Sequence, residues 1–230
     1  RLWWNAVNSL MLAGGASAIA VAVALLLAYG VRLNPNPVTK SATRVAGLGY
    51  AVPGSVIAVG ILIPLAWFDN MLDGWLRASF GVSSGLLLSG TIAALMFAYV
   101  VRFLAVSLNT VDASLAKVTP NMDGVARTLG MGPAATVVRV HAPIIAPSLM
   151  TAGLLVFVDV MKELPATLIL RPFDFNTLAV YAFELASDEQ LREAAAPALT
   201  IVAAGLIPVA LLSLAISRAR PGWAQAAVRP

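Results

Sequence analysis

Three ionisable side chains lie close together in a segment that is otherwise strongly apolar. Asp159, Lys162 and Glu163 are spaced i, i+3 and i+4, so a helix would place all three on one face. A charge near the centre of a bilayer costs about 3 kcal/mol, and ionisable residues inside membranes usually mark a route for ions or substrates. Two interpretations stay open. The face lines an aqueous pathway, or the charges form an ion-pair cluster that fixes helix packing.

A proline follows these charges and changes the local backbone. Pro165 lacks an N–H group and disfavours helical geometry at Leu164, so we expect the helix to break there. The break would expose backbone carbonyls and the Thr167 hydroxyl, which is tolerated at membrane depth only inside protein or beside water. The predicted pathway residues are Asp159, Lys162, Glu163, Pro165 and Thr167.

The residue types that most enzymes need are scarce. The chain has no cysteine and a single histidine, His141, which excludes disulfides and thiolate metal sites and leaves no plausible nucleophile constellation. No G-x-x-x-x-G-K-[ST] segment is present, so the chain has no phosphate-binding loop for a nucleotide. We therefore expect no catalytic residue, no stable metal site and no cofactor. Any nucleotide hydrolysis would take place on a partner.

The elements that must position these side chains are membrane helices. The 230 residues are 60% hydrophobic and only 11% charged, whereas soluble domains carry about 25% charged residues. The mean hydropathy is +0.87, and a transmembrane helix needs roughly 20 apolar residues. The sequence predicts an all-α, polytopic membrane protein with one transmembrane domain over 1–230. The five predicted spans are 6–29, 45–68, 78–101, 144–170 and 194–217.

The basic residues indicate the orientation of these spans. The connections 30–44 and 102–143 and the tail from Arg218, which includes Arg220 and Arg229, carry ten Lys and Arg residues, against four on the opposite side. Cytoplasmic loops are enriched in Lys and Arg, so the first group is predicted to be cytoplasmic. The N-terminus then lies outside, which implies a preceding transmembrane helix in a longer parent chain. The net charge of +4 is a topology signal, and we expect no nucleic-acid partner.

The connection 102–143 contains a short predicted helix. Thr119 is placed to cap it, and Pro120 suits its first position. Asp123 falls in the first turn, where a carboxylate suits the positive helix end, and Gly130 ends the helix. A capped helix between two spans is a candidate docking element for a partner protein. The alternative is an interfacial helix that lies on lipid.

The residues of this loop resemble the EAA loop of the inner-membrane permeases of ABC importers. The stretch Gly-Val-Ala-Arg-Thr-Leu-Gly is followed after nine residues by Val-His-Ala-Pro. The family pattern is Glu-Ala-Ala, three residues, Gly, nine residues and Ile-x-Leu-Pro, so Ala126, Gly130 and Pro143 match in identity and spacing. Gly124 replaces the glutamate, and Asp123, one position earlier, is a candidate for the acid.

The resemblance implies a five-helix core of the ABC importer permease (MetI-like) type, in which this loop forms a coupling helix that fits a cleft in a separate ATPase subunit. The implied partners are an ATPase dimer, an extracytoplasmic substrate-binding protein, a second permease half and membrane lipid, at the bacterial inner membrane. The residues implied in ATPase docking are Asp123, Gly124, Val125, Ala126, Arg127, Gly130 and Pro143.

A second resemblance concerns the substrate. The run Lys-Glu-Leu-Pro-Ala-Thr-Leu-Ile-Leu at 162–170 is similar to permeases of binding-protein-dependent iron(III) importers, in the C-terminal half of such chains less its leading helix. Asp159, Glu163 and Thr167 offer oxygen donors that suit a hard cation, whereas Lys162 argues against a tight site. Iron(III) would therefore pass transiently. The alternatives are a phosphonate, polyamine or oxyanion on the same architecture, or a secondary transporter whose charged residues relay protons.

The outer connection 171–193 is acidic, with five carboxylates and two arginines for a net charge of −3. Its apolar residues Leu178, Tyr181, Ala182 and Leu185 follow helical spacing. We expect a short outer helix that closes the pathway and meets the binding protein. The alternative is a solvated acidic loop.

Overall fold

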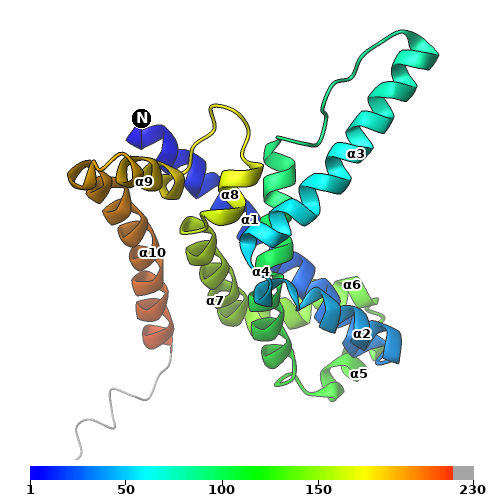
Figure 1. Cartoon of the computed structure of the whole chain (residues 1–230). Helices are drawn as coiled ribbons and strands as arrows, with labels where there is room; N and C mark the ends of the chain where they lie inside the picture. Colours follow the sequence, from blue (N-terminus) through cyan, green and yellow to red (C-terminus); the bar gives the residue numbers. More distant parts are fainter. Residues whose placement is uncertain (220–230) are drawn as a thin grey trace, which may run out of the picture.

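Helices account for all the regular structure in the described part of the chain. The computed structural model describes residues 1–219, and no strand occurs in that range. Five helical segments are long and apolar enough to cross a membrane, which confirms the predicted all-α polytopic fold (Figure 1). They are α1 (Leu2–Leu33), α3 (Gly54–Phe80), α4 (Ile92–Leu115), the rod Pro133–Met161 that ends in α7 (Ala142–Met161), and α10 (Leu191–Ala219). The short helices are α2 (Pro37–Ala46), η1 (Gly49–Ala51), α5 (Pro120–Thr128), α6 (Pro133–Thr136), η2 (Val137–His141), α8 (Pro165–Leu170) and α9 (Leu178–Ser187).

The centre of the molecule is a bundle of α1, α4 and α7. Helix α1 carries a row of alanines with a spacing of four residues, and Ala16, Ala20 and Ala24 are completely buried. Small residues let membrane helices approach closely, and α1 accordingly packs against both α4 and α7. From α4, Leu95 and Tyr99 fill the same core. These three helices form the scaffold for the sites described below.

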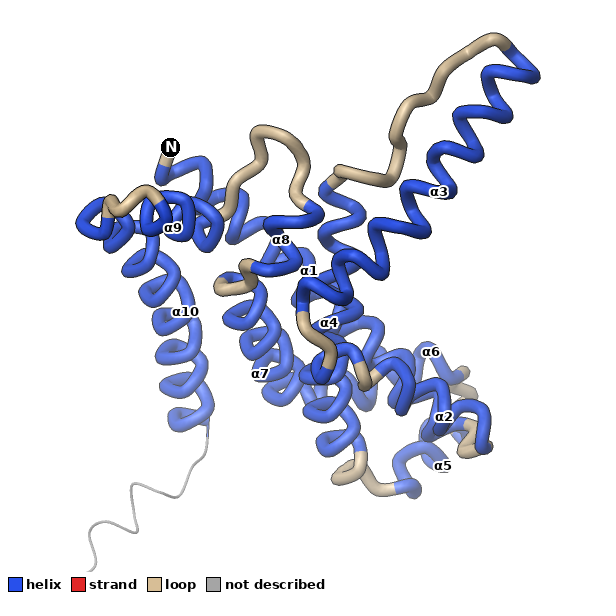
Figure 2. The backbone as a smooth tube through the Cα atoms, viewed as in Figure 1, coloured by secondary structure: helices blue, strands red, loops and turns tan. Residues whose placement is uncertain are grey.

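Helices α3 and α10 flank this bundle on opposite sides (Figure 2). Helix α10 packs on α7 and on the short helix α9. Only the first part of α3 contributes to the core, through Ile57 and Ala58. The rest of α3 projects away from the bundle and is followed by a long loop that returns to α4 (Figure 1).

The returning loop corrects the predicted span 78–101. Helix α3 continues to Phe80 and stops at Gly81, which has a left-handed φ of 68°. The loop then folds back along α3, because Asp73 Oδ1 accepts hydrogen bonds from the backbone N–H groups of Ser84 and Gly85. The segment from Gly81 to Gly85 is therefore loop. Hydropathy alone cannot distinguish this loop from a helix. Its backbone N–H groups are satisfied by the Asp73 carboxylate, which lies outside the apolar window.

The other predicted boundaries also move. Helix α3 begins at Gly54, directly after Pro53, so the window 45–68 starts too early. Helix α4 runs to Leu115, which shortens the predicted loop 102–143 at its start. Arg102 consequently lies in the middle of α4. The basic residues on the predicted cytoplasmic side fall from ten to nine, still against four, so the predicted orientation is unchanged. Arg220 and Arg229, counted in that total, lie outside the described residues.

Candidate translocation site and docking loop

The helix that carries the predicted pathway residues is broken. Helix α7 ends at Met161 and α8 begins at Pro165, as predicted from the proline. The intervening Glu163 organises the new helix start, because its Oε1 accepts a hydrogen bond from the Ala166 N–H at 3.2 Å. The Thr167 hydroxyl donates to the Glu163 carbonyl at 2.7 Å. A carboxylate at a helix N-terminus is favoured by its free N–H groups, so residues 162–164 form a defined corner between two helices.

Glu163 is paired with an arginine from a different helix. Arg102 Nε lies 3.2 Å from Glu163 Oε2, and the Glu163 side chain is only 6% exposed. Arg102 Nη1 also donates to the Val52 carbonyl at 3.0 Å. We call Arg102 and Glu163 the Glu163 pair. It ties the helix break to the middle of α4 and to the start of α3.

The surroundings of the Glu163 pair leave little free space. A Cβ atom on Gly54 would overlap Glu163 Oε1 and would lie 2.8 Å from Arg102 Nη1. Beside the pair, the Tyr99 and Thr167 hydroxyls form a 2.6 Å hydrogen bond, and both residues are buried. The break is thus embedded in a packed polar cluster of side chains from α3, α4 and α8.

The prediction that three charges share one helix face is wrong. Because α7 ends at Met161, Glu163 turns toward Arg102, whereas Lys162 Nζ contacts Asp159 Oδ1 at 2.9 Å. The Lys162 side chain is 63% exposed, in contrast to Glu163. Ion pairing, which the sequence left open, is therefore present in two separate pairs. In the described residues, no group of three or more His, Cys, Asp or Glu side chains is placed to hold a metal ion.

The sequence did not predict that Arg102 belongs to this site. The charge-free window stopped at Val101, so Arg102 was assigned to the following loop. A usable signal exists, because a single arginine inside an apolar helix needs a partner, and acidic residues are rare in the other spans. The identity of that partner depends on which helices are neighbours, which the sequence does not state.

At the other end of the bundle, α5 forms the predicted loop helix. It starts at Pro120, after Thr119, as predicted, but the Thr119 side chain makes no capping hydrogen bond. Its end is closed by the motif glycine. Gly130 has a φ of +76°, and the N–H groups of Gly130 and Met131 donate to the Arg127 and Ala126 carbonyls, each at 2.9 Å. This left-handed helix cap explains why the position is glycine.

The seven predicted docking residues do not face the same way. Ala126 is buried and Asp123 is half-buried, and both point toward the bundle. The other five are exposed: Gly124, Val125, Arg127, Gly130 and Pro143. Two further exposed apolar residues, Met122 and Leu129, join Val125. Together they border an apolar hollow of about 250 Å³. The lining of this hollow is therefore almost entirely apolar, while the exposed polar residues of α5 are Asn121, Arg127 and Thr128.

Asp123 holds α5 to the bundle from inside. The Arg32 side chain at the end of α1 contacts Asp123 Oδ2 through Nη2 at 2.7 Å and Nε at 3.0 Å. On the other side, His141 Nε2 lies 3.1 Å from Asp123 Oδ1. Asp123 was predicted as the acid of the motif, but its role as an anchor, and the two partners, were not predicted.

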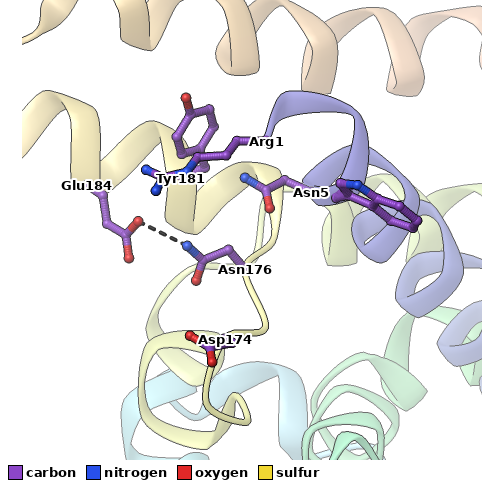
Figure 3. A pocket seen from close by; sticks show the side chains of 7 residues that line it. Arg1, Asn5, Asp174, Asn176, Tyr181 and Glu184 are labelled. Atoms are coloured by element: carbon purple, nitrogen blue, oxygen red, sulfur yellow. Dashed lines mark hydrogen bonds between the residues drawn. The ribbon is translucent and has the colours of Figure 1, made fainter.

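On the predicted outer side, α9 confirms the short helix expected there. It spans Leu178–Ser187, and Leu178 is completely buried. Glu184 contacts Arg171 and accepts a hydrogen bond from Asn176, both at 3.1 Å. Asn176 and Glu184, with Arg1 and Asn5 from the start of the chain, line a polar cavity of about 490 Å³ between α9 and the start of α1 (Figure 3). The acidic connection thus contains an ordered helix and borders a polar cavity.

Comparison with known proteins agrees with this architecture. No protein-family model matches the chain. The chain is 31% identical over 205 residues to the Fe(3+)-transport system permease protein FbpB 2 of Haemophilus influenzae, covering 89% of this chain and 37% of that protein. It is 26% identical over 205 residues to a Salmonella typhimurium protein named as a 2-aminoethylphosphonate transport system permease, covering 89% and 71%. The chain therefore spans little more than a third of the iron permease that it matches.

Solved structures share the fold. A bacterial ABC transporter involved in the import of the acidic polysaccharide alginate matches with a TM-score of 0.75 at 14% identity, covering 95% of this chain and 79% of that chain. A bacterial alginate ABC transporter in complex with a pentasaccharide-bound periplasmic protein matches with a TM-score of 0.70 at 13% identity, covering 90% and 75%. The chain has the fold of ABC importer permeases. The resemblance to ABC importer permeases, predicted from the loop, and the likeness to iron(III) permeases, predicted from the run at 162–170, are both confirmed.

Proposed function

We propose that this chain is a permease subunit of an ATP-driven importer in the bacterial inner membrane. It forms one half of the translocation pathway for iron(III), which an extracytoplasmic binding protein delivers. The observation that carries this proposal is the geometry of α5. The helix is held from inside through Asp123 and presents Met122, Val125 and Leu129 to the outside. Exposed apolar patches mark protein or membrane interaction sites, and we assign this one to a partner protein.

The partner at α5 is an ATPase dimer. The chain itself contains no phosphate-binding loop, so ATP hydrolysis takes place on a separate subunit and reaches the membrane through α5. The exposed motif residues Val125, Arg127 and Gly130 form the docking surface. A second permease half, carrying its own loop, binds the second ATPase subunit and completes the pathway.

The pathway runs along the helix break. Oxygen donors flank this corner, because Asp159 lies on the last turn of α7 and Thr167 donates to the Glu163 carbonyl at the start of α8. Oxygen ligands suit a hard cation such as iron(III). A transport route should bind its substrate weakly, because a deep energy well would trap the ion. The cations Arg102 and Lys162, each beside a carboxylate, keep the oxygens from forming a tight site. The tight iron site then belongs to the binding protein.

A phosphonate or related oxyanion is the second candidate substrate. The relative named for 2-aminoethylphosphonate transport supports it. So does Arg102, a guanidinium at the break, since arginine binds phosphonate-like oxygens in a two-pronged geometry. We take iron(III) as the first candidate; the likeness of the run at 162–170 to iron(III) permeases and the 31% identity to the iron permease support it.

Transport by the assembled importer in proteoliposomes tests the proposal. The vesicles contain this permease, its second half and the ATPase, with the binding protein outside and ATP inside. We expect uptake of radiolabelled iron(III) that stops when ATP is withheld, and no uptake of 2-aminoethylphosphonate. ATP-dependent uptake of the phosphonate alone would move the second candidate to first place. Uptake driven by a proton gradient without ATP would refute the importer and favour a secondary transporter.

A further inference from the structure

The contacts of Arg32 go beyond a simple ion pair with Asp123. Its Nη1 donates to the Leu115 carbonyl at 2.8 Å, and its Nη2 donates to the Val118 carbonyl at 2.9 Å. Leu115 is the last residue of α4, and Val118 follows it in the connection to α5. The last carbonyls of a helix have no intrahelical partner and are free to accept such bonds. One guanidinium group therefore joins three elements: the end of α1, the end of α4 and the first turn of α5.

His141 adds a fourth element on the other side of Asp123. It is completely buried at the end of the π-helix η2, directly before α7. The Tyr29 ring from α1 packs edge-on against its imidazole, with ring centroids 5.3 Å apart. Within residues 1–219, neither its ring nitrogens nor Asp123 Oδ1 makes a well-aligned hydrogen bond. The 3.1 Å contact between His141 Nε2 and Asp123 Oδ1 is thus close but imperfectly aligned.

We propose that Arg32, Asp123 and His141, which we call the Asp123 junction, transmit movement of the docking helix to α1 and α7 together. Asp123 is a positioning residue in this junction, because it acts through its two partners and touches no substrate. A shift of α5 that separated Asp123 from Arg32 and His141 would leave a half-buried charge without its partners, which is costly. Helix α7 leads directly to the break at Glu163, so the junction links the docking surface to the proposed pathway. This inference rests on the proposed function.

The π-helix η2 fits a mobile connection at this point. It occupies Val137–His141, between α6 and α7. Segments of π-helix have wider turns than an α-helix and occur frequently at functional sites. Here the wide turn ends at the residue that faces Asp123. A change in the winding of η2 would move α7 along or around its axis while His141 stays in contact with Asp123.

The first test measures ATPase activity in the assembled importer. Asp123→Asn removes the charge with little change in size, and Asp112→Asn is the matched control, since Asp112 is exposed on the same end of α4. We expect Asp123→Asn to reduce stimulation by the loaded binding protein at least about fivefold, the size of a typical allosteric coupling. Stimulation is expressed relative to the basal ATPase activity of each variant, and subunit assembly is checked by co-purification. Asp112→Asn should behave as the wild type, and Asp123→Glu should restore part of the stimulation.

The second test does not depend on transport. The chain has no cysteine, so spin labels at Thr128→Cys on α5 and Met150→Cys on α7 report one distance without background labelling. Both sites are exposed. In the full chain in lipid nanodiscs, we expect one narrow distance distribution, which Asp123→Asn broadens and Asp112→Asn does not.

The two readouts separate the possible outcomes. A narrow distribution in Asp123→Asn would overturn the junction, whatever the ATPase result, and so would retained stimulation in a variant whose distribution has broadened. A wild-type importer that shows no ATP-dependent uptake would refute the proposed function, yet the nanodisc distances would still report on the junction. If Asp123→Asn fails to fold, Arg32→Lys keeps the charge but loses the two-pronged contact. It should give the same two changes to a smaller extent.

Discussion

The Asp123 junction and the Glu163 pair are both built on an arginine and a carboxylate, but they differ in how firmly they are held. Arg32 donates to Asp123 and to two backbone carbonyls at 3.0 Å or less, and His141 faces the same carboxylate. In the Glu163 pair, Arg102 Nε lies 3.2 Å from the carboxylate without forming a well-aligned hydrogen bond. Its one close hydrogen bond goes to the Val52 carbonyl.

An arginine and a carboxylate can therefore form either a firmly held contact or one that separates easily. A guanidinium with several good acceptors resists separation, because each lost hydrogen bond leaves a buried group unsatisfied. A pair with a single ionic contact separates at a lower cost. The Asp123 junction is therefore suited to stay closed and to carry force, and the Glu163 pair is suited to open and close as the proposed pathway changes shape.

Removing either arginine tests most directly how firmly the two pairs are held. Arg32→Ala and Arg102→Ala each leave a carboxylate without its arginine, and removing one partner of a buried pair costs about 3–5 kcal/mol. Asp123 keeps its contact with His141. We expect Arg32→Ala to be the more destabilising of the two, since it also removes hydrogen bonds to two carbonyls, those of Leu115 and Val118, whereas Arg102→Ala removes one, to Val52. Chemical unfolding in detergent, compared between the two variants, measures this. A larger loss from Arg102→Ala would reverse the assigned roles.

Gly130→Val tests the docking side without touching a charge. A branched residue at a left-handed φ of +76° costs about 1–2 kcal/mol, so the end of α5 should distort. We expect transport to stop and binding-protein stimulation of the ATPase to be lost. Gly132→Val, at an ordinary φ of −74° and likewise with no atom near its Cβ position, is the control. Full transport by Gly130→Val would mean that the end of α5 does not take part in docking.

Glu163→Gln tests the pathway side. The amide keeps the size of the side chain but removes the charge that faces Arg102 and the proposed substrate. We expect iron uptake to fall about tenfold, or about 1.4 kcal/mol in the barrier, while ATPase stimulation remains. Undiminished uptake would leave Glu163 with a purely structural role. Thermal unfolding of the same sample separates loss of function from loss of fold.

Lys162→Met should have the smallest effect. The Lys162 side chain is mostly exposed and pairs with Asp159 one helical turn away, and exposed pairs contribute about 0–1 kcal/mol. We expect unfolding in detergent to change by less than about 1 kcal/mol. A loss as large as that of Arg102→Ala would show that Lys162 is buried in the assembled importer. That result would extend the Glu163 pair to all three charges.

Local chemistry made part of this structure predictable. Pro165 starts α8, Pro120 starts α5 and Gly130 ends it, as expected, because proline and glycine act on the backbone beside them. The same holds for the outer helix α9, whose apolar spacing is visible in the sequence. Docking at α5 and the pathway at the break were both predicted from these local signals and remain proposals.

The partners of the charges could not be predicted in this way. Arg102 and Glu163 meet only because α4 lies beside α8, and Asp123 meets Arg32 only because α1 ends beside α5. Hydropathy windows also misplace the start of α4. They count apolar residues and cannot see that Asp73 accepts hydrogen bonds from the loop that follows α3. The contacts that the sequence did not predict all join segments that are separated along the chain.

The alanine row of α1 has a mechanical consequence. Where Ala16, Ala20 and Ala24 meet α4 and α7, α1 contributes only methyl groups and backbone to the contact. Such a surface has few protruding side chains to lock one helix against another, so small sliding movements of packed helices require little repacking. Helix α1 therefore has a smooth packing surface. Arg32 is fixed at one end of it, so a small displacement there can travel the length of α1 to the opposite face of the membrane.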